Sequence, residues 1–525
     1  MKYLRVLLFL ISIITVNAQD VPINPNLSWN GESSLAINPV DSNNLVTAWM
    51  KLTGIGRVSI AVSSSFDGGQ TWSVPVNMPH FFVNSTSADP TLCFRNDGIL
   101  FLGYIDYLLT HDSGAVYVAQ SSSGGLTWYS PVEAINGFAT PDLPVDRPWI
   151  TIDNSNTSSQ GKIHVITKSI KDAPFPHAVW HIESSDSGAT WSAPELVDDS
   201  IPIGPSISSM GIPAVSSDGT LHVLYLSYNP SQSLLPRYIL ASKTNSASGF
   251  TYKIVNTLPL NSFISPGDSL YQYSYHLATN PVDSNNLVII WTDNRNGDPD
   301  IYSASTFDEG ISWSLPLRIN DDSISNGVGQ DMCWAGFSAN GRYAAAWRDR
   351  REAGIGQNAD YKIYAVRSDD GGNSFSASDA LSSQSGPLYI PVDGNDFLGV
   401  ALSSSKVFSS WADKRNSRNQ IYLNSLFLNS ITTGIQDQNI ESELFIVHPN
   451  PVHGEITINI NCYDLQDVFV YDLFGKPVKH LSADELKTSS PKCKIDLKSL
   501  KPGIYAASFV SGRSKKRIVK KIVVF

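Results

Sequence analysis

A turn of the form Ser-x-Asp-x-Gly-x-Thr-Trp recurs along this chain, and it constrains the fold more than any other feature. Two copies are complete, at residues 65–72 and 184–191, and variants stand at 121–128, 306–313 and 368–375. The Asp side chain can accept backbone N–H bonds within a tight turn, Gly allows a positive φ, and the aromatic ring packs between strands. Repetition of such a unit predicts a repeating β architecture.

Pairs of apolar, alternating segments lie between these turns and predict antiparallel strand pairs. The string Asn-Pro-Val-Asp-Ser-Asn-Asn-Leu-Val, for example, occurs unchanged at 38–46 and at 280–288. The spacing of the pairs, roughly 55–65 residues, is the length of a four-stranded blade. We find seven pairs, at 32–49, 87–104, 146–168, 210–227, 273–291, 330–347 and 391–411.

These pairs predict an all-β fold, a seven-bladed β-propeller over residues 19–430, with six blades as the alternative. The seventh pair lacks a convincing turn and fourth strand, and the segment Val21-Pro22-Ile23-Asn24 matches the missing strand. We therefore expect the N-terminal segment to complete the last blade, which would remove an exposed sheet edge.

The repeated turns resemble the Asp-box, or BNR, repeats of the sialidase-like propeller superfamily. The resemblance implies that Asp67, Asp186, Asp308 and Asp370 are structural residues distant from the active centre. Sialidases have six blades and begin an arginine triad in a Phe/Tyr-Arg-Ile-Pro motif near the N-terminus. The corresponding stretch here, residues 27–35, contains no arginine, which disfavours an authentic sialidase.

The two ends of the chain carry export signals. Residues 1–18 are typical of a signal peptide, with Lys2 and Arg5 before an apolar core, and no later stretch is long enough for a spanning helix. Residues 445–525 resemble the type A sorting domain of the type IX secretion system, through Pro449-Asn450-Pro451, residues 470–476 and residues 500–505. They predict a small β-sandwich, joined by a polar linker at 431–444. We expect a secreted or cell-surface protein that meets the type IX machinery.

Charge restricts the class of partner. The net charge is −11, and the basic residues concentrate after Lys487, so the body of the chain is acidic. Nucleic-acid binding requires clustered Lys and Arg and is not expected. An extracellular polysaccharide or glycoconjugate is the expected partner, and an acidic glycan would need a local basic pocket.

A motif Trp-x-Asp-x-Arg recurs after the second strand of three units. Its arginines are Arg295, Arg351 and Arg415, and period-two spacing places each Trp, Asp and Arg on one face of a strand. One interpretation is a repeated Asp–Arg bridge between blades behind a packing Trp. The other is a basic, substrate-binding rim for a carboxylated or sulfated sugar, since Arg binds such groups with paired hydrogen bonds.

Further polar residues lie where the central channel should open. β-Elimination of a uronic acid requires a histidine or tyrosine base beside an arginine that neutralises the carboxylate. The candidate residues resemble the set used by some ulvan-type polysaccharide lyases. The catalytic candidates are His177, Tyr228, Arg237 and His276. The substrate-binding candidates at the starts of inner strands are Asp89, Asp146, Arg147 and Asp331.

The function class stays open between three hypotheses. A lyase would use the His, Tyr and Arg set, whereas a hydrolase would need two carboxylates across the channel, for which Asp89, Asp146 and Asp331 are candidates. The non-enzymatic hypothesis is a glycan-binding or adhesion propeller. We expect no organic cofactor and no catalytic metal. Asp298 and Asp300 form a plain acidic loop or, alternatively, a structural calcium site.

Overall fold

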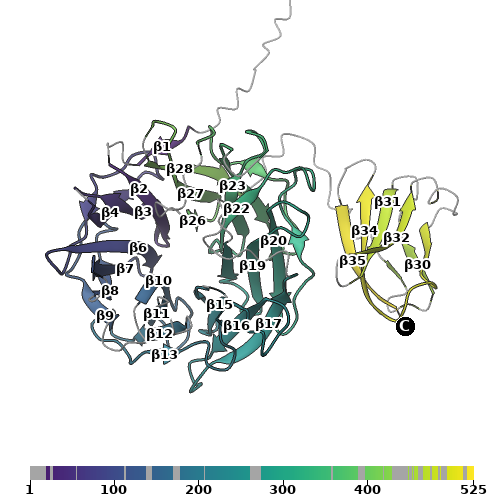
Figure 1. The fold of residues 1–525 in the computed structure, drawn as a ribbon, viewed down its shortest axis with the longest axis horizontal. Helices are drawn as coiled ribbons and strands as arrows, with labels where there is room; N and C mark the ends of the chain where they lie inside the picture. The colour runs from purple at the N-terminus through teal and green to yellow at the C-terminus, as the bar shows by residue number, and fades with distance from the viewer. Residues whose placement is uncertain are drawn as a thin grey trace, which may run out of the picture. The chain divides into compact units, whose positions relative to one another are not determined.

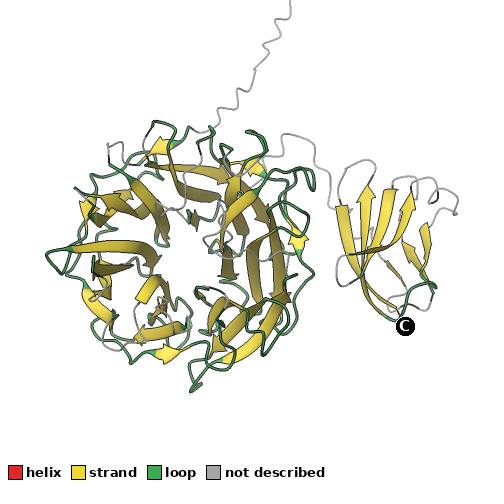
Figure 2. Cartoon of the chain, in the orientation of Figure 1, coloured by secondary structure: helices red, strands yellow, loops and turns green. Residues whose placement is uncertain are grey.

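The computed structural model divides into two compact units, Met1–Asn429 and Ser430–Phe525, and each is described by itself. The structure describes residues 19–23, 28–54, 56–110, 114–137, 145–169, 178–205, 207, 209–259, 274–355, 359–387, 397–417, 419–428, 447–448, 452, 454–458, 465–472, 476–482, 485, 493–511 and 517–524. The expected signal peptide and linker lie outside these residues. In the described ranges the regular structure is β-strand (Figure 2), and no helix there could cross a bilayer.

The described part of the first unit forms seven four-stranded antiparallel sheets arranged around a common centre (Figure 1), which is a β-propeller. In chain order, the first four sheets are β2 (Asn30–Asn38), β3 (Asp41–Leu52), β4 (Val58–Ser65) and β5 (Val76–Asn77); β6 (Ser85–Phe94), β7 (Leu100–Leu108), β8 (Gly114–Ser121) and β9 (Val132–Asn136); β10 (Val145–Ile152), β11 (Ile163–Ser169), β12 (Val179–Ser184) and β13 (Glu195–Leu196); and β14 (Ile212–Val215), β15 (Leu221–Ser227), β16 (Arg237–Lys243) and β17 (Thr251–Thr257).

The other three sheets follow the same order from the centre outward. They are β18 (Tyr275–Thr279), β19 (Asn286–Asp293), β20 (Asp300–Phe307) and β21 (Leu317–Arg318); β22 (Gln330–Phe337), β23 (Tyr343–Asp349), β24 (Lys362–Ser368) and β25 (Asp379–Ala380); and β26 (Gly399–Leu402), β27 (Lys406–Asp413), β28 (Gln420–Phe427) and β1 (Val21–Pro22). The ring is held together by apolar clusters that span neighbouring sheets, with Trp49, Trp291, Trp347 and Trp411 fully buried among them.

The N-terminal strand closes the last sheet, as the sequence predicted. Val21 pairs with Leu423 and Pro22 with Tyr422, and the Ile23 N–H donates to the Ile421 carbonyl at 2.8 Å. The neighbouring Asp20 carboxylate accepts from the Ser383 N–H and from the Asn424 amide, each at 2.8 Å. The outer edge of β28 is therefore paired rather than exposed.

The Asp-box turns connect the third and fourth strands of their sheets, and each is held by hydrogen bonds within the turn itself. Asp67 Oδ1 accepts the backbone N–H groups of Gln70 and Thr71 at 2.9 Å, and the Thr71 hydroxyl donates to Oδ2 at 2.6 Å. Gly69 has a φ of 89°, and the Trp72 indole donates to its carbonyl at 3.2 Å. The copies at Asp186, Asp308 and Asp370 repeat the same Ser or Thr hydroxyl bond to the carboxylate.

These turns make the propeller sensitive to strong acid. The hydroxyl donor, together with backbone donors, lowers the pKa of Asp67, Asp186 and Asp308 to about 2. A lowered folded-state pKa contributes stability above the unfolded value of about 4 that is lost as the pH falls towards 2. We expect Asp186→Asn to unfold with less dependence on pH between about 4 and 2 than the wild type, measured by tryptophan fluorescence. The exposed Asp199→Asn is the control, and equal pH dependence in the three proteins would contradict the expectation.

The C-terminal unit contains two sheets that share one hydrophobic core. One sheet has the order β29 (Val447–His448), β30 (Glu455–Ile458) and β33 (Cys493–Asp496); the other has the order β32 (Pro477–Ser482), β31 (Leu465–Tyr471), β34 (Gly503–Ser511) and β35 (Arg517–Val524). Val452, Ile456, Val468, Ile495 and Ile522 are buried between them. Two sheets facing one core form the small sandwich that the strand pattern predicted.

Candidate functional site

The innermost strands of four sheets share a bulge near their first residues. The pairing register with the second strand shifts between Gly31 and Ser34, Ala88 and Thr91, Asp146 and Trp149, and Asp331 and Trp334. Inside each bulge one residue has a positive φ: Glu32 (50°), Asp89 (54°), Arg147 (51°) and Met332 (55°). A non-glycine residue in this region costs about 1–3 kcal/mol, and such residues concentrate at functional sites. A bulge bends its strand and re-aims the side chain inside it, and two of these residues, Asp89 and Arg147, line one recess beside the central cavity.

Three carboxyl groups from three neighbouring sheets, those of Glu32, Asp89 and Asp146, come together beside this recess. Asp89 shares hydrogen bonds with Asp146 and with Glu32, and its Oδ2 accepts the Arg147 backbone N–H at 3.2 Å. Lys168, on the strand next to Asp146, places its Nζ 3.2 Å from Asp146 Oδ2. Glu32 and Asp89 are buried, whereas the Asp146 side chain is 27 % exposed. Solvent therefore reaches the cluster at Asp146.

The environment drives the two aspartates to opposite protonation states. Burial, and then the charge of Asp146, raise the pKa of Asp89 to about 7. Burial also opposes ionisation of Asp146, but Lys168 and Arg147 outweigh it and lower the pKa of that carboxyl. Burial, with Asp89 and Asp146, raises the pKa of the adjacent Tyr107 to about 12. A proton donor thus lies beside an ionised carboxylate near neutral pH, which is the arrangement that acid–base catalysis uses.

An aromatic cavity of about 200 Å³ occupies the centre of the ring beside this cluster. Its walls include Trp149, His276, Trp334 and Phe397. The Trp149 ring lies 4.9 Å from Trp334 and 5.3 Å from Phe397, and the His276 ring lies 4.1 Å from Trp334, measured between centroids. Burial lowers the pKa of His276 to about 3, so its imidazole is neutral. A recess lined by Asp89, Arg147, Trp149 and Phe397 adjoins the cavity but is closed, with no room for a water molecule.

Of the expected catalytic residues within the described ranges, only His276 lines the cavity. Neither Tyr228 nor Arg237 is among the lining residues in the described part of the chain. Tyr228 follows β15, where its N–H donates to the Ile203 carbonyl at 2.7 Å. Arg237 begins β16 and donates to Gln232 Oε1 at 3.3 Å. His177 lies outside the described residues.

The Trp-x-Asp-x-Arg motifs form closed units. Asp349 Oδ2 accepts from the Trp347 indole at 3.0 Å and from Arg351 Nη2 at 2.8 Å, and the Arg351 guanidinium stacks 4.3 Å from the Tyr364 ring centre. The motifs of Arg295 and Arg415 repeat the bond to Asp and the stacking on a tyrosine, Tyr302 or Tyr422. Each motif thus forms its own Asp–Arg pair, and Arg351 also bridges to Asp321, which follows the last strand of the preceding sheet, at 2.6 Å. Because their charges are already paired, we assign these three arginines a structural role in place of the substrate-binding rim.

Asp331 is an interior residue rather than a channel residue. Its carboxylate accepts from Arg348 Nε at 2.8 Å and from Arg350 Nη1 at 3.0 Å, and all three side chains are 0 % exposed. A fully buried carboxylate cannot contact a ligand in the channel. We therefore assign Asp331 to the scaffold, and Asp89, Asp146 and Arg147 remain from the expected substrate-binding set.

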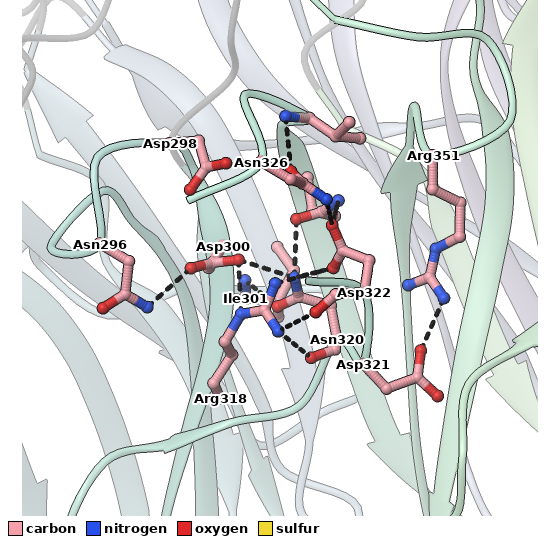
Figure 3. A network of polar contacts seen from close by, with 12 residues as sticks. Asn296, Asp298, Asp300, Ile301, Arg318, Asn320, Asp321, Asp322, Asn326 and Arg351 are labelled. Atoms are coloured by element: carbon pink, nitrogen blue, oxygen red, sulfur yellow. Dashed lines mark hydrogen bonds and ion pairs between the residues drawn. The ribbon is translucent and has the colours of Figure 1, made fainter. Parts of the chain in front are cut away.

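The acidic loop at Asp298 and Asp300 is paired with a cationic side chain, Arg318 of β21. Figure 3 shows the Arg318 guanidinium between Asp300 and Asp322; its Nε lies 2.6 Å from Asp300 Oδ1 and its Nη2 2.8 Å from Asp322 Oδ1. The Asn320 amide donates to both carboxylates at 2.8 Å, and Asp298 Oδ2 accepts the Gly327 N–H at 2.7 Å. Arginine and amide donors fill the position that a calcium ion would take, so this loop fits the plain structural interpretation.

Three of the site residues were not candidates from the sequence. Glu32, Tyr107 and Lys168 complete the carboxyl cluster, but no motif marks them. Of the three, only Glu32 could have been found from the sequence, because it lies in an inner strand as Asp89 and Arg147 do. A non-glycine residue with positive φ is a property of the folded backbone and is invisible in the sequence.

Comparison with known proteins identifies the C-terminal unit. Residues 446–525 match the family described as the secretion system C-terminal sorting domain, so the chain is directed by type IX secretion to the cell surface or the extracellular space. No curated protein matches the chain. The first unit is a β-propeller, and the chain ends in the sorting domain.

Solved structures of three kinds are similar to this chain. A Dyadobacter fermentans protein of unknown function has 15% identity and a TM-score of 0.43, covering 67% of this chain and 97% of its own. The GH93 α-L-arabinofuranosidase of Fusarium graminearum has 12% identity and a TM-score of 0.44, with coverages of 78% and 98%. The intramolecular trans-sialidase of Ruminococcus gnavus has 14% identity and a TM-score of 0.39, with coverages of 75% and 94%.

Proposed function

We propose that this protein is an exported enzyme that cleaves glycosidic linkages in acidic glycans, with its active site at one mouth of a seven-bladed ring. The observation that carries the proposal is the carboxyl cluster, in which Asp89 has a pKa of about 7 beside the ionised Asp146. Hydrolysis and β-elimination both need a proton on the departing oxygen. Asp89, with a pKa of about 7, holds a proton up to neutral pH and can supply it.

The groups around Asp89 define the kind of substrate. Trp149 and Phe397 form apolar walls of the central cavity, as in many ligand pockets with a few polar groups. Arg147 provides a cation in the closed recess that adjoins this cavity, and a guanidinium binds a carboxylate with paired hydrogen bonds. A sugar carrying a carboxylate, as in a uronic or sialic acid, satisfies both features.

The spacing of the carboxyl groups bears on the reaction. A retaining hydrolase separates its two carboxyls by about 5–5.5 Å and an inverting one by about 6.5–9.5 Å. Asp89 and Asp146 share a hydrogen bond, so they act as one proton-transfer unit rather than as an acid and a distant nucleophile. Reaction products distinguish the two chemistries: elimination leaves an unsaturated uronate that absorbs ultraviolet light, whereas hydrolysis leaves only new reducing ends or free sialic acid.

The substrate class is tested with Arg147→Gln on the polysaccharide that the wild type degrades. We expect kcat/KM on an acidic glycan to fall about 100-fold, or roughly 3 kcal/mol of transition-state stabilisation, because the carboxylate loses its partner. Arg342→Gln is the matched control, since Arg342 pairs with the exposed Asp369 at 3.2 Å. Glycan binding without turnover in the wild type would favour a non-catalytic binding propeller, and equal activity of the two variants would remove Arg147 from the site.

A further inference from the structure

A second polar cluster lies within the third sheet, away from the channel. His164 on β11 pairs directly with Glu183 on β12, and His181 lies two residues before Glu183 on the same face of that strand. Each of the three residues offers one potential ligand atom, and these atoms all lie within 4.8 Å of one another. Both histidines are buried, with exposed fractions of 3% and 2%.

The distances between these donor atoms match the edges of a small coordination tetrahedron. His164 Nδ1 lies 3.0 Å from His181 Nε2 and 3.6 Å from Glu183 Oε2, and His181 Nε2 lies 4.0 Å from the same oxygen. Zinc–nitrogen and zinc–oxygen bonds of 2.0–2.2 Å place tetrahedral ligands about 3.3 Å apart. Each edge therefore needs to change by less than about 1 Å to surround an ion.

The groups behind the cluster hold the ligands in the orientation that a metal requires. Glu195 Oε2 lies 3.3 Å from His181 Nδ1, so that nitrogen carries the proton and Nε2 presents its lone pair. A carboxylate on the far nitrogen of a histidine is the usual outer support of a zinc ligand. Lys243 of the next sheet binds Glu195, and Lys162 binds Glu183 through Oε1 at 2.9 Å, leaving Oε2 directed at the histidines.

We propose that His164, His181 and Glu183 form a zinc site, with a water molecule as the fourth ligand and Glu195 as the positioning residue. The cluster goes beyond the glycan site, since none of its residues lines the central cavity. On β11, His164 and the channel residue Lys168 are separated by about 13 Å of strand. The ion ties β11 to β12, and the Glu195–Lys243 pair connects it to the fourth sheet, so the site stabilises the junction between two sheets.

Zinc binding is measured on the full chain, purified without a polyhistidine tag, stripped with a chelator and titrated with zinc against a chromophoric competitor. We expect one zinc ion per wild-type chain, and a melting temperature that rises by several degrees on zinc addition, since a ligand that binds only the folded state stabilises it. His164→Asn should lose both effects. No zinc bound by the wild type, or unchanged affinity in His164→Asn, would overturn the proposal.

His222 supplies a matched control. It occupies the position on β15 that His164 occupies on β11, it is equally buried, and its ring bonds to Ser216 and Ser242, both at 2.8 Å, instead of to carboxylates. His222→Asn should bind zinc like the wild type, and loss of binding in this variant would overturn the assignment. Glu195→Gln should weaken zinc binding about 10- to 100-fold, because the support of a metal-binding histidine has that effect.

Cobalt substitution gives a second test, which uses the wild-type protein and does not depend on the folding of His164→Asn. Wild-type protein loaded with Co²⁺ should show the intense visible bands of tetrahedral coordination and lose them on zinc addition. The weak spectrum of an octahedral ion would overturn the proposal. Glu183→Gln, which leaves both histidines in place, should reduce the intensity of these bands.

Discussion

Asp89→Asn should lower turnover of the glycan substrate by about 10²- to 10⁴-fold, the range over which a general acid contributes. Asparagine keeps the size of the side chain and can still donate to Asp146, but it cannot release a proton to a departing oxygen. The measurement is kcat at neutral pH on the substrate that the wild type degrades. Wild-type activity should itself fall as the pH rises through about 7, where Asp89 loses its proton.

The same substitution should stabilise the protein at alkaline pH. The pKa of Asp89 is raised from 3.8 to about 7 in the folded state, so the native protein binds more protons than the unfolded chain between these values. Its contribution to stability is full below pH 3.8 and is lost as the pH rises through about 7. Asparagine carries no titrating proton, so the Asp89→Asn variant does not lose this stability. We expect its free energy of unfolding to exceed that of the wild type by about 2–4 kcal/mol near pH 8.

Chemical denaturation at about pH 5 and pH 8 measures this gain. All 12 tryptophans precede residue 430, so tryptophan fluorescence reports on the propeller unit alone. Asp41→Asn, at an exposed position, is the control and should leave turnover and stability unchanged. An active Asp89→Asn variant, or one less stable than the wild type at the higher pH, would contradict the assignment of Asp89 as a buried proton donor.

Asp331→Asn should destabilise the propeller by about 3–5 kcal/mol, the typical cost of breaking a buried ion pair on one side. The Asp331 carboxylate lies between the Arg348 and Arg350 guanidinium groups, and all three are 0 % exposed. Asparagine removes the negative charge and leaves two buried cations facing a neutral amide. Water cannot reach them to compensate, so the loss appears in the free energy of unfolding.

Urea unfolding followed by tryptophan fluorescence tests this expectation. Asp97→Asn is the matched control: it breaks the bidentate contact with Arg95, in which the Asp97 side chain is 52% exposed. Exposed pairs contribute about 0–1 kcal/mol, so the control should unfold close to the wild type. A loss below about 1 kcal/mol in Asp331→Asn would show that the arginines are satisfied without the carboxylate.

The sequence predicted the features that repeat. The Asp boxes and the strand pairs follow from local patterns, because each depends on residues within one blade length. The pairing of Val21 with Leu423 joins the two ends of the ring, and it was predicted from the strand that the seventh repeat lacks. The sequence also placed Asp89, Asp146 and Arg147 on inner strands, and they lie on the inner strands β6 and β10.

The contacts between sheets could not be predicted. Asp89 and Asp146 lie on different strands, and their hydrogen bond depends on two bulges whose positive φ values no sequence pattern marks. The Trp-x-Asp-x-Arg motif was compatible with a bridge or with a rim, and only the paired geometry of Asp349 and Arg351 separates the two. Similarly, His164 meets His181 through a strand register that the sequence leaves open.

A crystal structure of the Asp89→Asn variant with an acidic oligosaccharide would show whether the substrate binds beside Arg147. The variant retains the cavity but does not turn over the sugar. We expect a sugar ring in the central cavity against Trp149 and Phe397, with its carboxylate paired to Arg147 and its glycosidic oxygen at residue 89. An oligosaccharide bound at another face of the propeller, with the cavity empty, would refute the roles given to Asp89 and Arg147.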